Sequence, residues 1–123
     1  MPSKNHVEFR PLTHEDLLSL YGRPFPASCV GYAAYLGGEV IAAAGIAYVR
    51  PAQCFSIMKP EMKHHPRRIV EAIRLLRQKL DSVTFSVFAT PDVDEDTAPG
   101  FLRHVGFVEI EEGVYQWPQQ SRS

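Results

Sequence analysis

The most chemically distinctive segment of this sequence is a cluster of basic residues at the predicted start of a helix. The end of a helix that exposes free N–H groups also carries a partial positive charge, so cations there are unfavourable unless an anion lies nearby. The cluster therefore indicates a solvent-exposed cap, a phosphate-binding site, or a contact surface for an acidic protein or nucleic acid. Its members are Lys63, His64, His65, Arg67 and Arg68.

A second charged segment, Asp92 to Asp96, begins like a calcium-binding loop, with acids at alternate positions. Thr97 takes the place of the glycine that such loops require, and no bidentate glutamate follows at the proper distance. Cys29 and Cys54 belong to no Cys/His pattern typical of zinc. We therefore expect no metal, and we expect both thiols to be reduced.

Apolar periodicity predicts the elements that position these residues. The clearest is a helix at Pro66–Leu80, whose apolar residues recur every three or four positions. Shorter helices are predicted between Thr13 and Gly22 and at Thr97–Val105. A predicted strand precedes the long helix and another follows it, which forms a βαβ unit. This unit predicts a mixed α/β sheet in which Ala52–Met58 and Val83–Ala89 are adjacent and parallel. The predicted strands are Val7–Arg10, Cys29–Leu36, Glu39–Tyr48, Ala52–Met58, Val83–Ala89, Phe107–Ile110 and Val114–Trp117.

Length and composition indicate one ordinary globular domain. The chain has 123 residues, of which 45% are hydrophobic and 22% charged, so we expect a single domain at 1–123 with its core at about 7–117. A formal net charge of −1 argues against a general nucleic-acid or membrane-surface binder. The sequence contains neither a secretory signal pattern nor an apolar stretch long enough to cross a bilayer. We therefore expect a cytoplasmic protein.

The order of elements resembles that of the GNAT superfamily of N-acetyltransferases. Phe101–Val108 is similar to the family's late helix with its "YxxLGF" turn, and Met58–Lys63 is similar to the end of its fourth strand, "V-x-P-E-Y-R". The resemblance covers Val7 to Trp117. It implies an α+β fold with a mostly antiparallel sheet, helices on both faces, and one parallel strand pair that splays apart near Met58 to hold acetyl-CoA.

The resemblance also implies a degenerate active site. The family's pyrophosphate loop, Q/R-x-x-G-x-G/A, falls on Lys63–Arg68, where Pro66 lacks an N–H and the Arg68 side chain crowds a phosphate. Leu102 stands where the family often has the tyrosine that protonates the leaving thiolate. We therefore predict weak or absent acetyl-CoA binding. The implied cofactor contacts are Ile57, Met58, Lys63, His64, His65, Arg67 and Arg68.

In this family a general base is commonly drawn from the middle strands. The candidates here are Glu39, at a turn, and Gln53 and Ser56, on the strand before the cofactor loop. Tyr115 is a further hydroxyl, with packing in the core as the alternative interpretation. Histidine is a common acid–base residue, but a lone histidine is more often structural than catalytic.

Two functions of different classes fit this sequence. One is an acetyl-CoA-dependent N-acetyltransferase that acts on a small-molecule or protein amine. The other is an inactive GNAT-like protein, a virion component or interaction module with a protein partner. The second hypothesis rests on Pro60–Arg68, which resembles the matching segment of small GNAT-like proteins encoded by tailed bacteriophages; such a protein would occur in a bacterial host cell or in the virion.

Overall fold

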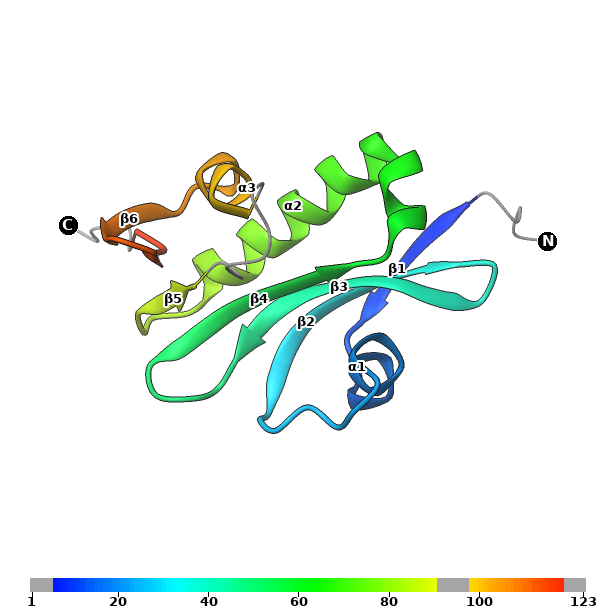
Figure 1. Cartoon of the computed structure of the whole chain (residues 1–123), viewed down its shortest axis with the longest axis horizontal. Helices are drawn as coiled ribbons and strands as arrows, with labels where there is room; N and C mark the ends of the chain where they lie inside the picture. Colours follow the sequence, from blue (N-terminus) through cyan, green and yellow to red (C-terminus); the bar gives the residue numbers. More distant parts are fainter. Residues whose placement is uncertain (1–5, 91–97, 119–123) are drawn as a thin grey trace.

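A single mixed sheet organises the computed structural model, which describes residues 6–90 and 98–118 (Figure 1). Its seven strands lie in the order β1-β2-β3-β4-β5-β7-β6. β4 and β5 are parallel, and the other neighbouring strands in this sheet are antiparallel. The predicted fold class is therefore confirmed. The strands are β1 (Val7–Pro11), β2 (Cys29–Leu36), β3 (Glu39–Ala47), β4 (Ala52–Met58), β5 (Val87–Ala89), β6 (Val108–Glu111) and β7 (Val114–Gln116).

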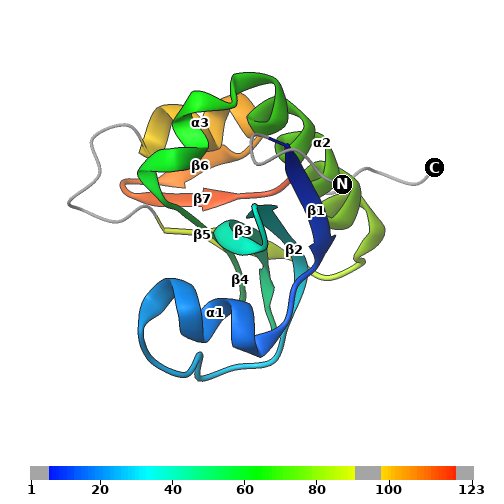
Figure 2. The same cartoon turned by 90° about the vertical axis from the view of Figure 1, so that its right-hand side faces the viewer.

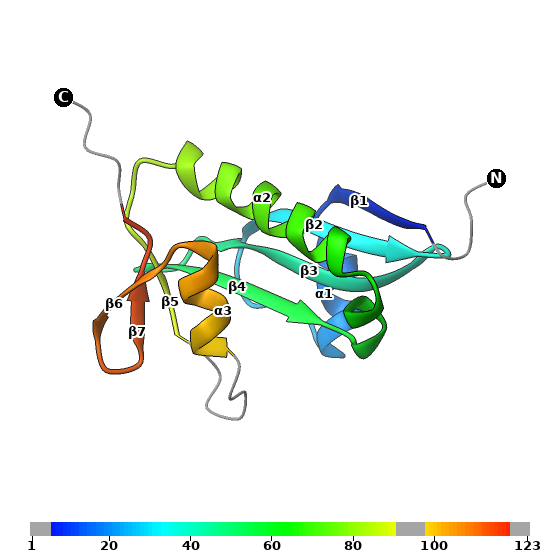
Figure 3. The ribbon, with the colours of Figure 1, turned by 90° about the horizontal axis from the view of Figure 1, so that it is seen from above.

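Helices cover both faces of the sheet. Helix α1 (His14–Tyr21) lies on one face, while α2 (Pro66–Ser82) and α3 (Ala98–Val105) lie on the other (Figures 1 and 2). Seen from above, α2 runs across the sheet and α3 lies on the side of β5 to β7 (Figure 3). None of the helices in the described ranges is long and apolar enough to span a membrane.

Helix α1 is held at both ends by local hydrogen bonds. The Thr13 hydroxyl accepts from the Asp16 amide while the Asp16 carboxylate accepts from the Thr13 amide, which is a capping box. The buried Asp16 carboxylate also accepts a hydrogen bond from the Tyr35 hydroxyl of β2. Gly22 ends the helix with a φ of 75°, a left-handed conformation that costs glycine little. The loop that follows therefore starts from a fixed point.

The core consists of two clusters of buried residues. The larger one joins α2, the middle of the sheet and the β6–β7 end, and includes Ile46, Leu80 and Tyr115. The smaller one packs against β1, β2 and β3 and includes Met62, which is 1% exposed. The apolar face predicted for α2 is confirmed, because Leu76 and Leu80 are buried.

Several predicted boundaries were wrong. The strand predicted at Val83–Ala89 is limited to Val87–Ala89, because α2 continues to Ser82 and Val83 is its C-cap. A 3₁₀ helix at Pro60–His64 (η1) was not predicted, and it links β4 to α2. Smaller shifts affect the two strands after α3 and the end of the second hairpin strand. The acidic segment Asp92–Asp96 and Thr97 lie outside the described residues.

Candidate functional site

Among the described residues, no strand pairs with one side of β4 beyond Gln53. β5 pairs with β4 only at Ala52 and Gln53, so the two strands part toward Met58 as predicted. On the other side, the Lys59 amide donates to the Ile41 carbonyl of β3 at 2.8 Å. In an antiparallel ladder, alternate residues direct their amide and carbonyl groups to the neighbouring strand and away from it. Cys54, Ser56 and Met58 direct these groups away from β3. The parallel bridge between Gln53 and Phe88 engages the Cys54 amide with β5, so Ser56 and Met58 carry the amides that face the open side.

The backbone donors at the start of α2 are mostly taken. A helix begins with free N–H groups that can hold an anion. Here the His65 amide donates to Met62 at 3.0 Å, the Arg68 amide donates to the His65 carbonyl at 3.0 Å, and Pro66 has no N–H. Arg67 is the first-turn residue whose amide finds no backbone acceptor within the described ranges. The 3₁₀ helix η1 therefore removes a donor that the sequence pattern left free.

The basic cluster is divided by its side-chain contacts. The Arg68 guanidinium lies 2.6 Å from Glu71 Oε2 and 3.4 Å from His6 Nδ1, so it is drawn along α2 toward the start of β1. The side chains of Lys63, His64 and Arg67 are exposed, and that of His65 is half-buried. In the part of the chain that the structure describes, these four side chains make no hydrogen bond or ion pair.

The three candidate bases do not come together. Glu39 Oε1 lies 3.3 Å from Lys59 Nζ, at the end of β4 near η1. Gln53 lies at the opposite end of the strand and donates to the Pro51 carbonyl at 3.4 Å. Ser56 is exposed between them, and strand alternation places it on the opposite face from Gln53. Only Ser56 lies in the stretch of β4 whose edge is open.

Tyr115 is part of the larger core cluster, and Leu102 packs against that cluster. Tyr115 is 1% exposed, and its hydroxyl accepts from the Arg103 guanidinium at 3.4 Å. The Leu102 carbonyl accepts the amides of Gly106 and Phe107, which closes α3. These contacts give Tyr115 a packing role. On α3, the apolar Leu102 stands where the resemblance implies a proton donor.

The two cysteines are free thiols. Burial raises the pKa of Cys54 to about 12 and raises the pKa of Cys29 as well. A thiol is nucleophilic as the thiolate, so Cys54 is not an activated nucleophile near neutral pH although it lies on β4. Within residues 6–90 and 98–118, no three metal-ligating side chains gather into one group.

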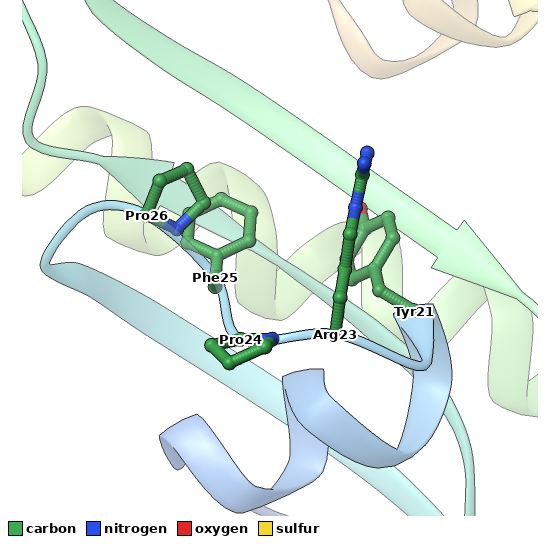
Figure 4. Close-up of a pocket in the computed structure, with 5 residues that line it drawn as sticks. All are labelled: Tyr21, Arg23, Pro24, Phe25 and Pro26. Atoms are coloured by element: carbon green, nitrogen blue, oxygen red, sulfur yellow. The ribbon is translucent and has the colours of Figure 1, made fainter.

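A hollow of about 460 Å³ lies in the loop between α1 and β2. Figure 4 shows Tyr21 and Arg23 extending in the same direction, with Phe25 and Pro26 across from them. The ring centroids of Phe25 and Phe55 are 5.1 Å apart, which places the loop against β4. This segment is not among the candidate site residues that the sequence indicated. The signal available in the sequence was Arg23 followed by Phe25, which lies between two prolines.

Solved structures of acetyltransferases share this architecture. The Escherichia coli ribosomal-protein-S18-alanine N-acetyltransferase matches 96% of this chain over 97% of its own, with a TM-score of 0.63 and 16% identity. The E. coli protein YhhK, bound to coenzyme A, matches 91% of this chain over 98% of its own, with a TM-score of 0.58 and 14% identity. AtaTR bound with acetyl-CoA matches 91% of this chain over 92% of its own, with a TM-score of 0.54 and 11% identity.

This chain therefore has the GNAT acetyltransferase fold. No protein-family model matches the sequence, and no curated protein matches it either. Identities of 11–16% establish the fold and leave activity to be argued from the site.

Proposed function

We propose that this chain is an acyl-CoA-dependent N-acyltransferase with a weak pyrophosphate site. The observation that carries the proposal is the open edge of β4. Amide and carbonyl groups at alternate residues form a row there, spaced about 7 Å apart along an extended strand. A pantetheine arm carries two amides of its own, so it can add to this edge as a further strand would.

The fit to the rest of the cofactor is poorer. Pro66 and the internal bonds of His65 and Arg68 leave the Arg67 amide as the main backbone donor at the start of α2. The exposed side chains of Lys63 and Arg67 are free to hold a phosphate through their charges, and His64 can add a ring N–H donor. Mobile cations lose more conformational entropy on binding than fixed backbone amides do. We therefore propose that they compensate for the lost backbone donors only in part.

The chemistry follows from positioning. When bound, acetyl-CoA supplies an acetyl thioester, from which an acceptor amine takes the acetyl group and releases the free thiol of coenzyme A. With Leu102 at the position of the family's acid, this chain provides no side-chain donor there. Holding two reactants in a fixed geometry is itself worth several kcal/mol. We propose that the main chain of β4 provides this positioning.

A second candidate function is a GNAT-like protein without catalysis, acting as an interaction module or a virion component of a phage. It is favoured by the same loss of backbone donors at α2 and by Leu102. The side chains of Lys63, His64 and Arg67, which form no ion pair within the described ranges, would then contact an acidic protein partner.

Calorimetric titration with acetyl-CoA separates the two candidates. The acyltransferase proposal predicts a dissociation constant weaker than about 100 μM, which corresponds to about −5.5 kcal/mol. A value in the low micromolar range would contradict the weak pyrophosphate site and show that the cations replace the lost donors. No heat of binding at millimolar acetyl-CoA would contradict the acyltransferase proposal and favour the interaction module.

A further inference from the structure

We propose that the hollow lined by Tyr21, Arg23, Pro24, Phe25 and Pro26 is the acceptor subsite, and that it takes an amine which also carries a carboxylate and an apolar group. An amino acid with an apolar side chain is the simplest member of this class. The inference rests on the acyltransferase function proposed above, and the hollow itself is a feature of the loop between α1 and β2.

The walls of the hollow are fixed before any ligand enters. Pro24 and Pro26 restrict the backbone on either side of Phe25. The Gly22 amide donates a hydrogen bond to the Leu18 carbonyl, which anchors the loop to the end of α1. The Phe25 ring lies between two others, with centroids 5.9 Å from Tyr21 and 5.1 Å from Phe55. A cavity of about 460 Å³ falls within the size range of small-molecule sites, and preorganised walls reduce the entropy lost on binding.

The charge of the hollow selects an anion. Arg23 is the charged residue among its five lining residues. Its guanidinium is exposed, and no carboxylate in the described part of the chain forms an ion pair with it. A guanidinium pairs with a carboxylate through two parallel hydrogen bonds, while the aromatic and proline walls favour an apolar group. Burial, followed by the nearby Cys29, raises the pKa of Tyr21, so its hydroxyl stays protonated and can donate.

The hollow is connected to the open edge through Phe55. Phe55 lies on β4 next to Ser56, whose main-chain groups face the open side. The ring of Phe55 packs on Phe25 of the loop that follows α1. Helix α1 covers one face of the sheet and the start of α2 lies on the other (Figure 2). An acceptor held at Arg23 therefore approaches β4 from the face opposite the basic cluster.

The test needs no acetyl-CoA, and its ligands carry the predicted carboxylate and apolar group on an already acetylated nitrogen, as the reaction product would. N-acetyl-L-phenylalanine and its amide, N-acetyl-L-phenylalaninamide, differ by the carboxylate alone. Each is titrated into 15N-labelled protein while the amide resonances are followed by NMR. We expect the carboxylate ligand to shift the signals of residues 21–25 and to bind about fivefold tighter than the amide, the preference that one exposed ion pair gives.

Arg23→Gln should abolish this preference, because glutamine keeps hydrogen-bonding capacity and removes the charge. Arg74→Gln is the matched control, since Arg74 is an exposed arginine on α2 without an ion pair in the described structure. Equal binding of the two ligands, an unchanged preference in Arg23→Gln, or no shifts at millimolar ligand would each overturn the inference. The calorimetric titration with acetyl-CoA judges the proposed function separately, so the two failures are distinguishable.

Discussion

The double variant Pro66→Gly/Arg68→Gly is expected to bind acetyl-CoA at least about tenfold more tightly than the wild-type chain, a gain of about 1.4 kcal/mol. Glycine at position 66 adds an N–H at the first turn of α2, where the dipole favours an anion. Glycine at position 68 has no Cβ, so the backbone of this turn can approach a phosphate more closely. The double variant also loses the ion pair between Arg68 and Glu71. This pair is partly exposed and contributes little to stability.

Calorimetry of the wild type, the double variant and Pro60→Gly checks this prediction. Pro60 is the proline at the start of η1, so its replacement adds an N–H and backbone freedom at a helix start several residues away from α2. We expect Pro60→Gly to leave the affinity for acetyl-CoA unchanged. If the double variant binds no better than wild type, missing backbone donors are not what limits cofactor binding.

Gly45→Ala is expected to lower the free energy of unfolding by about 3 kcal/mol or more, at the upper end of what overpacking costs. Gly45 pairs with Gly31 across β2 and β3. A Cβ on Gly45 would lie 2.2 Å from the Val30 carbonyl oxygen, and one on Gly31 would lie 2.1 Å from that of Ala44. Backbone atoms cannot swing aside as a flexible side chain can, so the strands would have to separate.

Urea denaturation measures this loss against Gly38→Ala. Gly38 has a φ of 84° and no atom within 4 Å of an added Cβ, so alanine there meets conformational strain alone, about 1–2 kcal/mol. Equal losses in the two variants would show that the close approach of β2 and β3 is not rigid. Because β3 pairs with the full open stretch of β4, its rigidity also matters to the site.

The sheet and the long helix could be predicted because apolar periodicity is a local property of the chain. Cys29–Leu36 and Ala52–Met58 were predicted at their observed bounds. Residues 83–86 were assigned to a strand because they are β-branched, aromatic or small. The end of α2 and the pairing partners of β5 decide where that strand begins, and these depend on distant residues.

The site was less predictable because it depends on contacts between elements. The bond from His65 to Met62 exists because η1 forms, and Arg68 is held by Glu71 and His6. The contacts with Met62 and His6 do not follow from the spacing of the basic cluster, whereas the pair with Glu71 is one that helical spacing allows. The hollow at Arg23 needs Phe25 to pack on Phe55, a contact between residues thirty positions apart.

The most direct test of the central claim is an NMR titration of the 15N-labelled chain with coenzyme A. If the open edge of β4 holds the pantetheine arm, the largest amide shifts along this strand should belong to Ser56 and Met58, whose N–H groups face away from β3 and lie beyond the pairing with β5. The amides of Phe55 and Ile57 are bonded toward β3 and should shift less. Shifts confined to residues 63–68, with none along β4, would contradict the account.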